Sequence, residues 1–167
     1  MNSICVYCGS SFGNETAFAA AARQLAKAMN ERSISLVYGG ASVGIMGEIA
    51  DAILAGGGRA IGVIPQALAD KEVAHSDLTE LHIVSSMHER KALMAEKSDG
   101  FVALPGGFGT LEELFEVLTW SQLGFHQKPV ALLNVANYYD GLLKFLDQAA
   151  HAQLVKPAHR NFLIAGE

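Results

Sequence analysis

The stretch GFVALPGGFGTLEELFEVLTW, residues 100–120, contains an apolar run, a glycine-rich loop and an amphipathic segment in direct succession. The apolar run predicts a buried strand at 100–104, and the leucine spacing after the loop predicts a helix over 111–123. A glycine loop that opens a helix favours a bound phosphate, because the first N–H groups of a helix carry partial positive charge. The stretch therefore indicates an α/β fold with an anion site at a strand-to-helix turn.

The rest of the chain repeats this alternation of apolar runs and amphipathic segments. Most of the apolar runs are almost continuous, which is typical of parallel strands covered on both faces. The alternation predicts an α/β fold with a doubly wound parallel sheet flanked by helices and right-handed crossovers. No repeat or linker interrupts the pattern, so residues 1–167 are expected to form a single domain. Further strands are expected at 4–8, 35–38, 60–64, 80–84 and 130–134, and further helices at 16–30, 45–54, 87–97 and 138–150.

The composition is that of a globular chain with its own core, because 50% of the 167 residues are hydrophobic and only 17% are charged. A net charge of −5 argues against a nucleic-acid binder, which needs a basic face. No apolar run approaches the roughly 18 residues of a membrane span. The start MNSICVYCGS lacks the basic region of a signal peptide. We therefore expect a soluble, cytoplasmic protein that binds neither nucleic acid nor membrane.

The only two cysteines, Cys5 and Cys8, form a single CxxC pattern. A zinc site would need two more ligands at a matching spacing, and the histidines do not provide them. Redox CxxC pairs normally open a helix, whereas Cys5 lies in a predicted strand, so both thiols are interpreted as packing residues. Neither a metal nor a redox cofactor is expected.

Two glycine-rich loops are candidate phosphate sites. One precedes the 111–123 helix and includes Thr110, whose hydroxyl can cap the helix or bind an anion. The other opens the 45–54 helix. Neither loop matches the Walker A or the dinucleotide-binding fingerprint, and tight turns also use glycine for steric reasons alone. Because the carboxyl ends of parallel strands meet at one edge of a sheet, both loops are expected to converge there.

Charged side chains interrupt apolar faces on two of the predicted helices. In the 111–123 helix, Glu113 is expected to point away from the sheet together with Val117 and Trp120, which indicates a ligand pocket or a partner subunit. The helix dipole alone accounts for Glu112. The face expected to pack on the sheet carries Leu111, Leu114, Phe115 and Leu118.

The 87–97 helix shows the complementary pattern, since Arg90 and Lys91 share a stripe with Met87 and Met94. These basic side chains can simply extend over the edge of the core. Alternatively, Arg90 is held against an anionic or planar ligand, because a guanidinium binds phosphate bidentately and stacks on bases. The pattern leaves both interpretations open.

The segments MHERKALM (87–94) and PGGFGTLEE (105–113) together resemble the Lonely Guy family, the cytokinin riboside 5′-monophosphate phosphoribohydrolases. The family pattern PGGxGTxxE is matched without departure, and CVYCGSS and YGGASVGIMGEIA extend the resemblance over essentially the whole chain. The resemblance implies a Rossmann-like fold and a homodimer with its active site at the subunit interface. It also implies hydrolysis of the N-glycosidic bond of AMP or its N6-prenylated forms, which releases the free base and ribose 5-phosphate.

The resemblance further implies that Arg90 and Glu113 are the catalytic pair. A carboxylate at Glu113 would stabilise an oxocarbenium-like centre and orient the attacking water. A non-catalytic nucleotide sensor or carrier on the same fold is the alternative, although a pure binder would not need this pair. The expected substrate-binding residues are Gly106, Gly107, Gly109 and Thr110 of the first loop, Gly40, Ser42 and Gly44 of the second, and Met87, Lys91 and Glu112.

Overall fold

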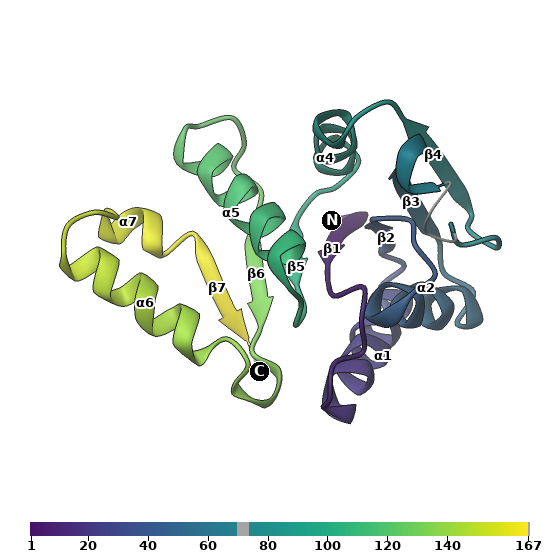
Figure 1. Cartoon of the computed structure of the whole chain (residues 1–167), viewed down its shortest axis with the longest axis horizontal. Coiled ribbons are helices and arrows are strands. Elements are labelled where there is room, and N and C mark those ends of the chain that lie inside the picture. The colour runs from purple at the N-terminus through teal and green to yellow at the C-terminus, as the bar shows by residue number, and fades with distance from the viewer. Residues whose placement is uncertain (70–73, 167) are drawn as a thin grey trace.

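The structure is a computed structural model that describes residues 1–69 and 74–166 (Figure 1). Within these residues it confirms the α/β fold class, because one parallel sheet of seven strands carries helices on both faces. The strand order is β4-β3-β2-β1-β5-β6-β7. The strands are β1 (Ser3–Tyr7), β2 (Ser35–Tyr38), β3 (Ala60–Pro65), β4 (Glu80–Val84), β5 (Phe101–Ala103), β6 (Val130–Leu133) and β7 (Leu163–Gly166).

The helices divide the hydrophobic core into two layers, one on each face of the sheet. Helices α1 and α2 cover one face with residues such as Ala22 and Ile49, and α4, α5 and α6 cover the other with residues such as Met94 and Leu114. None of the helices among the described residues combines the length and the apolarity needed to cross a membrane. The helices are α1 (Thr16–Glu31), α2 (Gly44–Ala55), α3 (Gln66–Ala69), α4 (Met87–Glu96), α5 (Phe108–Gln122), α6 (Asp140–His151) and α7 (Pro157–Arg160), with a short 3-10 turn η1 (Val135–Asn137) before α6.

The expected elements are all present, and most of their ends agree within two residues. Two expectations about α5 were wrong. The helix begins at Phe108 rather than at residue 111. Val117 is only 2% exposed and belongs to the core, because the face turned to the sheet lies between Leu114 and Val117. Trp120, also expected to point away from the sheet, is partly buried and packs against the same core. Strand β7 was not expected, since it has only four residues and pairing with β6 defines it.

The two cysteines lie in the two different layers of the core. Cys5 packs with the α4–α5 layer and Cys8 with the α1–α2 layer, and neither forms a disulfide. Burial raises the pKa of both thiols well above their usual range, so both remain protonated and unreactive at neutral pH.

The strand order places a switch point between β1 and β5. From β1 the chain builds β2, β3 and β4 outward on one side, and then returns to start β5 on the other side of β1 (Figure 1). The loops that follow β1 and β5 therefore diverge and leave a crevice at the carboxyl edge of the sheet, where ligands of such folds bind. Gly9 N–H donates to the Pro105 carbonyl oxygen at 3.1 Å and joins the two loops at the base of this crevice.

Candidate active site

A cavity of about 260 Å³ lies at the switch point, between the loop after β1 and the amino-terminal end of α5. We call it the α4-side cavity, because Arg90 of α4 forms part of its wall. It is lined by Cys8, Gly9 and Ser10, by Met46 and Leu68, and by Arg90, Glu113 and residues 107–110. The structure thus brings the expected catalytic pair and most of the first glycine loop into one cavity.

Arg90 is held in place by the carbonyl ends of two strands. Its Nε donates to the Val63 oxygen at 3.0 Å, and one terminal nitrogen donates to the Gly39 oxygen at 3.2 Å. A Cβ at residue 39 would overlap the guanidinium, so a larger residue there would displace Arg90 from this position. The other terminal nitrogen lies 3.9 Å from Glu113 Oε1, and the two side chains are only 11% and 12% exposed. The guanidinium is therefore fixed by the backbone and faces the carboxylate across the cavity.

Burial raises the pKa of Glu113 to about 7, although the nearby positive charge of Arg90 opposes the shift. Glu112 adds a smaller contribution that raises the pKa further. A carboxyl group with a pKa near neutrality suits general base catalysis, because a large fraction of it is ionised at physiological pH and this form accepts a proton readily.

The raised pKa of Glu113 predicts a pH-dependent stability. The folded state binds this proton more tightly than the unfolded chain, so the stabilisation is complete below about pH 4.5 and is lost as the pH rises through 7. Between pH 5 and pH 8 the ionisation of this carboxylate therefore costs the folded state about 2–3 kcal/mol. Urea denaturation should show that Glu113→Gln gains stability relative to wild type by this amount between pH 5 and pH 8. An equal difference at both pH values would contradict the shift, and Glu96→Gln on the exposed side of α4 is the control.

Lys91 and Glu112, both expected to bind substrate, instead contact each other. Lys91 Nζ lies 2.6 Å from Glu112 Oε1 and 3.0 Å from Glu116 Oε1, and its side chain is 10% exposed. These ion pairs connect α4 to α5 directly beside Arg90 and Glu113. Neither Lys91 nor Glu112 lines the α4-side cavity, so the contacts indicate that they hold α4 and α5 in register.

The amino-terminal turn of α5 brings backbone N–H groups that lack a partner within the helix to the cavity. Gly107 is the N-cap, and the helical hydrogen bonds begin with Leu111 N–H donating to the Gly107 oxygen at 3.1 Å. The N–H groups of Phe108, Gly109 and Thr110 precede that bond and line the same cavity. A Cβ at residue 106 would overlap the Thr110 side chain, so the turn needs glycine there. This arrangement suits an anion such as phosphate.

The second glycine loop lies behind the cavity rather than in its wall. The Gly40 oxygen accepts the His75 N–H at 3.0 Å, and Gly44 packs so closely on Ser10 and Ser11 that a Cβ would overlap their backbone. Neither these two glycines nor Ser42 lines the cavity. The loop supports the segment after β1, which supplies Gly9 and Ser10.

Met87 also lies outside the cavity wall, at the start of α4, where it is 42% exposed with its sulfur 3.9 Å from Arg90. Cys8 and Ser10, which were not among the residues expected in the site, do line it. The glycine that follows β1 could have indicated these residues, because the carboxyl end of a strand at a switch point lies beside the ligand. Within residues 1–69 and 74–166, no group of three or more His, Cys, Asp or Glu side chains is placed to hold a metal ion.

Fold and site together define a Rossmann-like protein that combines a guanidinium–carboxylate pair with a helix start able to bind phosphate. Residues 46–167 match a family model described as "Possible lysine decarboxylase". The chain is 53% identical to the probable cytokinin riboside 5′-monophosphate phosphoribohydrolase LOGL9 of Oryza sativa subsp. japonica, over 97% of this chain and 71% of that protein. It is 52% identical to the cytokinin riboside 5′-monophosphate phosphoribohydrolase LOG2 of Arabidopsis thaliana, over 97% and 76% of the two chains. The chain therefore belongs to the Lonely Guy family of phosphoribohydrolases.

Solved structures share the fold at lower sequence identity. The molybdenum cofactor binding protein of Rippkaea orientalis aligns with a TM-score of 0.72 at 22% identity, over 99% of this chain and 89% of that one. The molybdenum cofactor carrier protein of Chlamydomonas reinhardtii aligns with the same TM-score at 21% identity and the same coverage. At these identities the likeness establishes the fold alone.

Proposed function

We propose that the protein hydrolyses the N-glycosidic bond of AMP and of N6-prenylated AMP, releasing the free base and ribose 5-phosphate. One observation carries this proposal: a terminal nitrogen of Arg90 lies 3.9 Å from Glu113 Oε1. Both side chains line the cavity that also contains the amino terminus of α5. The activity for which relatives at 52–53% identity are named supports the same reaction.

The spacing along α5 matches the length of a nucleoside monophosphate. The phosphate binds the N–H groups of Gly107, Gly109 and Thr110, and Glu113 follows Thr110 by three residues, about 4.5 Å along the helix axis. The ribose then lies between the phosphate and the carboxylate, so Glu113 does not compete with the phosphate for the helix start. This separation explains how an acidic residue is tolerated in the first turns of an anion-binding helix.

In the proposed reaction, the bond between C1′ and the base nitrogen breaks and the base leaves with the electron pair. Glu113 stabilises the positive charge that develops at C1′ and accepts a proton from the attacking water, whose oxygen bonds to C1′. The departing base takes up a proton. Arg90 favours the ionised form of Glu113 and keeps it in place.

Apolar side chains in the same cavity support a purine substrate with an N6-prenyl group. Met46 of α2, Leu68 of α3 and Phe108 of α5 all line the cavity. A planar base and an isoprenoid chain both gain from burial against such surface.

Product analysis tests the proposed function directly. Purified protein incubated with AMP or with N6-isopentenyl-AMP should release free base and ribose 5-phosphate, measured by chromatography, and the ratio of the two rates reports the preference for the prenyl group. Tight binding of both nucleotides without release of base would instead favour the sensor or carrier.

We further propose that the protein is a homodimer whose partner subunit covers the cavity. Phe108 at the cavity is 93% exposed, and exposed aromatic side chains beside a site indicate an interface. Phe108→Asp should shift the protein to a monomer in sedimentation experiments and lower its activity at least tenfold. Leu154→Asp, at a residue 86% exposed between α6 and α7, is the control. A monomeric wild-type protein would contradict the dimer.

A further inference from the structure

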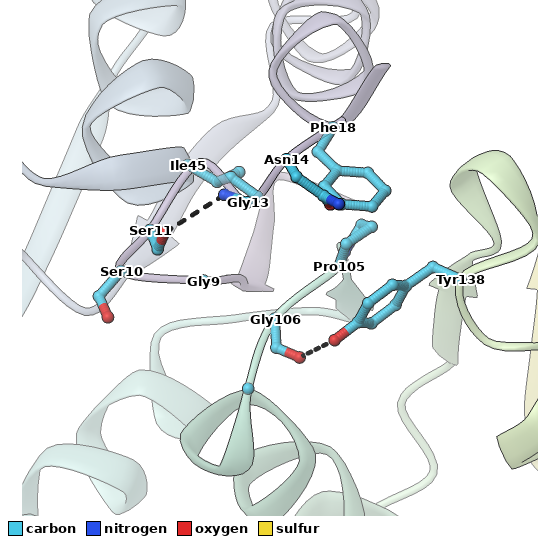
Figure 2. A pocket seen from close by; sticks show the side chains of 11 residues that line it. Gly9, Ser10, Ser11, Gly13, Asn14, Phe18, Ile45, Pro105, Gly106 and Tyr138 are labelled. Atoms are coloured by element: carbon cyan, nitrogen blue, oxygen red, sulfur yellow. Dashed lines mark hydrogen bonds between the residues drawn. The ribbon is translucent and has the colours of Figure 1, made fainter. Parts of the chain in front are cut away.

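A second cavity, of about 290 Å³, borders the same two loops (Figure 2). We call it the α1-side cavity, because Asn14 and Phe18 at the start of α1 form one wall and Tyr138 forms another. Gly9, Ser10 and Gly107 line both cavities. The loops after β1 and β5 are therefore a thin partition, with the catalytic pair on one side and Tyr138 on the other.

Two consecutive tyrosines bind the loop after β5 through its carbonyl groups. The Tyr138 hydroxyl donates to the Gly106 oxygen at 2.8 Å, as Figure 2 shows, and the Tyr139 hydroxyl donates to the Leu104 oxygen at 2.7 Å. The two hydrogen bonds lie on either side of Pro105. Tyr138 is 47% exposed, whereas Tyr139 is 2% exposed.

The segment that carries the tyrosines is itself rigidly held. Asn134 accepts the Tyr139 N–H and donates to Asp140, both at 2.7 Å. Ala136 has a φ of 52° and Asn137 a φ of 62°, and such left-handed residues persist where the surrounding contacts hold them. The ring of Tyr138 packs edge-on against Phe18 and Tyr139, with centroids 5.4 and 4.9 Å away. These contacts fix where the Tyr138 hydroxyl points.

Because the peptide bond is planar, the direction of the Gly106 carbonyl also sets the direction of the Gly107 N–H. In a trans peptide, the carbonyl oxygen of one residue and the N–H of the next point in opposite directions. The Gly106 carbonyl points to Tyr138 in the α1-side cavity. The N–H of Gly107 therefore points away from Tyr138, and Gly107 also lines the α4-side cavity together with the first turn of α5.

We propose that Tyr138 is a positioning residue, which holds the Gly106–Gly107 peptide so that the Gly107 N–H donates to the substrate phosphate. The inference rests on the proposed function, in which the phosphate binds at this turn. Two adjacent glycines leave that peptide plane free to rotate, because both sides of it lack a Cβ. A rotated peptide would present its carbonyl oxygen to the phosphate and replace an attraction by a repulsion.

Tyr139 provides a matched control within the same loop. Its hydroxyl also binds a backbone carbonyl, but the next residue is Pro105, which has no N–H to orient. Loss of the Tyr139 hydroxyl leaves the buried Leu104 oxygen without this donor, so Tyr139→Phe should lower the thermal midpoint. It should leave phosphate affinity unchanged. Tyr138→Phe should instead lower phosphate affinity and leave the thermal midpoint unchanged, because the half-exposed Tyr138 contributes little to stability.

The experiment compares wild type, Tyr138→Phe and Tyr139→Phe by calorimetry and steady-state kinetics. Tyr138→Phe should bind ribose 5-phosphate about tenfold more weakly and show a similar rise in KM for AMP, with kcat reduced less. Inhibition by adenosine, which lacks the phosphate, should be unchanged. A structural role alone would not separate ribose 5-phosphate from adenosine in this way.

Two results would overturn the inference: a Tyr138→Phe variant that binds ribose 5-phosphate as tightly as wild type, or equal weakening of ribose 5-phosphate and adenosine. Failure of the proposed function is separate, because it would appear as a wild-type protein that binds ribose 5-phosphate but releases no base from AMP. A wild-type protein that does not bind ribose 5-phosphate would overturn the phosphate site and the role of Tyr138 together.

Discussion

Glu113→Gln is expected to lower kcat for AMP hydrolysis by about 10³-fold while the protein remains folded. Glutamine keeps the size of the side chain and its contacts, but it neither accepts the proton of the attacking water nor stabilises positive charge at C1′. The variant should still bind AMP, because the phosphate donors lie earlier in α5. Single-turnover measurements with AMP, together with a binding isotherm, separate the two effects.

The neighbouring carboxylate serves as the control for Glu113. Glu112 lies in the same helical turn and pairs with Lys91 outside the cavity, so Glu112→Gln should lose less than tenfold in kcat. If Glu113→Gln turned over AMP at the wild-type rate, the catalytic assignment would be wrong. Comparable losses in both variants would mean that the effect arises from helix packing rather than from chemistry.

Arg90→Met is expected to lower kcat/KM by about 10²-fold and to change the pH dependence of the reaction. Arg90 opposes the rise in the pKa of Glu113, so removing its charge should raise that pKa further above 7. Activity that requires ionised Glu113 then rises at a higher pH than in the wild type. Profiles of kcat/KM against pH between 5 and 10 measure the displacement.

An arginine at the far edge of the sheet controls for the loss of a positive charge. Arg59 pairs with Glu80 of β4, and its side chain is 59% exposed. Arg59→Met should keep both the wild-type rate and the wild-type pH profile. A profile that stays unchanged in Arg90→Met would show that the guanidinium does not act on Glu113, and Arg90 would then be a structural residue of α4.

The succession of strands and helices along the chain is a local property, and the sequence predicted it well. Periodicity identifies a buried strand or an amphipathic helix from adjacent residues, so the expected elements are found with small errors at their ends. Strand β7 was not predicted, because its four residues show no periodic pattern of their own and form a strand by pairing with β6. The orientation of α5 was misjudged for a related reason, since Val117 is buried by the position of the sheet rather than by the helix itself.

The candidate site likewise has features that the sequence predicts and features that depend on the fold. Arg90, Glu113 and the PGGFGT loop carry side chains and spacing that predict chemistry directly from the sequence, and the fold brings them to one cavity. Other features depend on residues that are distant in the chain. Lys91 pairs with Glu112, 21 positions away, and the Tyr138 hydroxyl donates to Gly106, 32 positions away. The raised pKa of Glu113 depends on burial by the folded chain.

Sequence alone therefore determined the fold class, the family and the two residues expected to perform the reaction, because these follow from short patterns. Only the tertiary structure decided which neighbours of those residues contact the cavity and which hold the helices together. The physical reason is that a side chain's partners and its desolvation are set by elements that the chain brings together only when it folds.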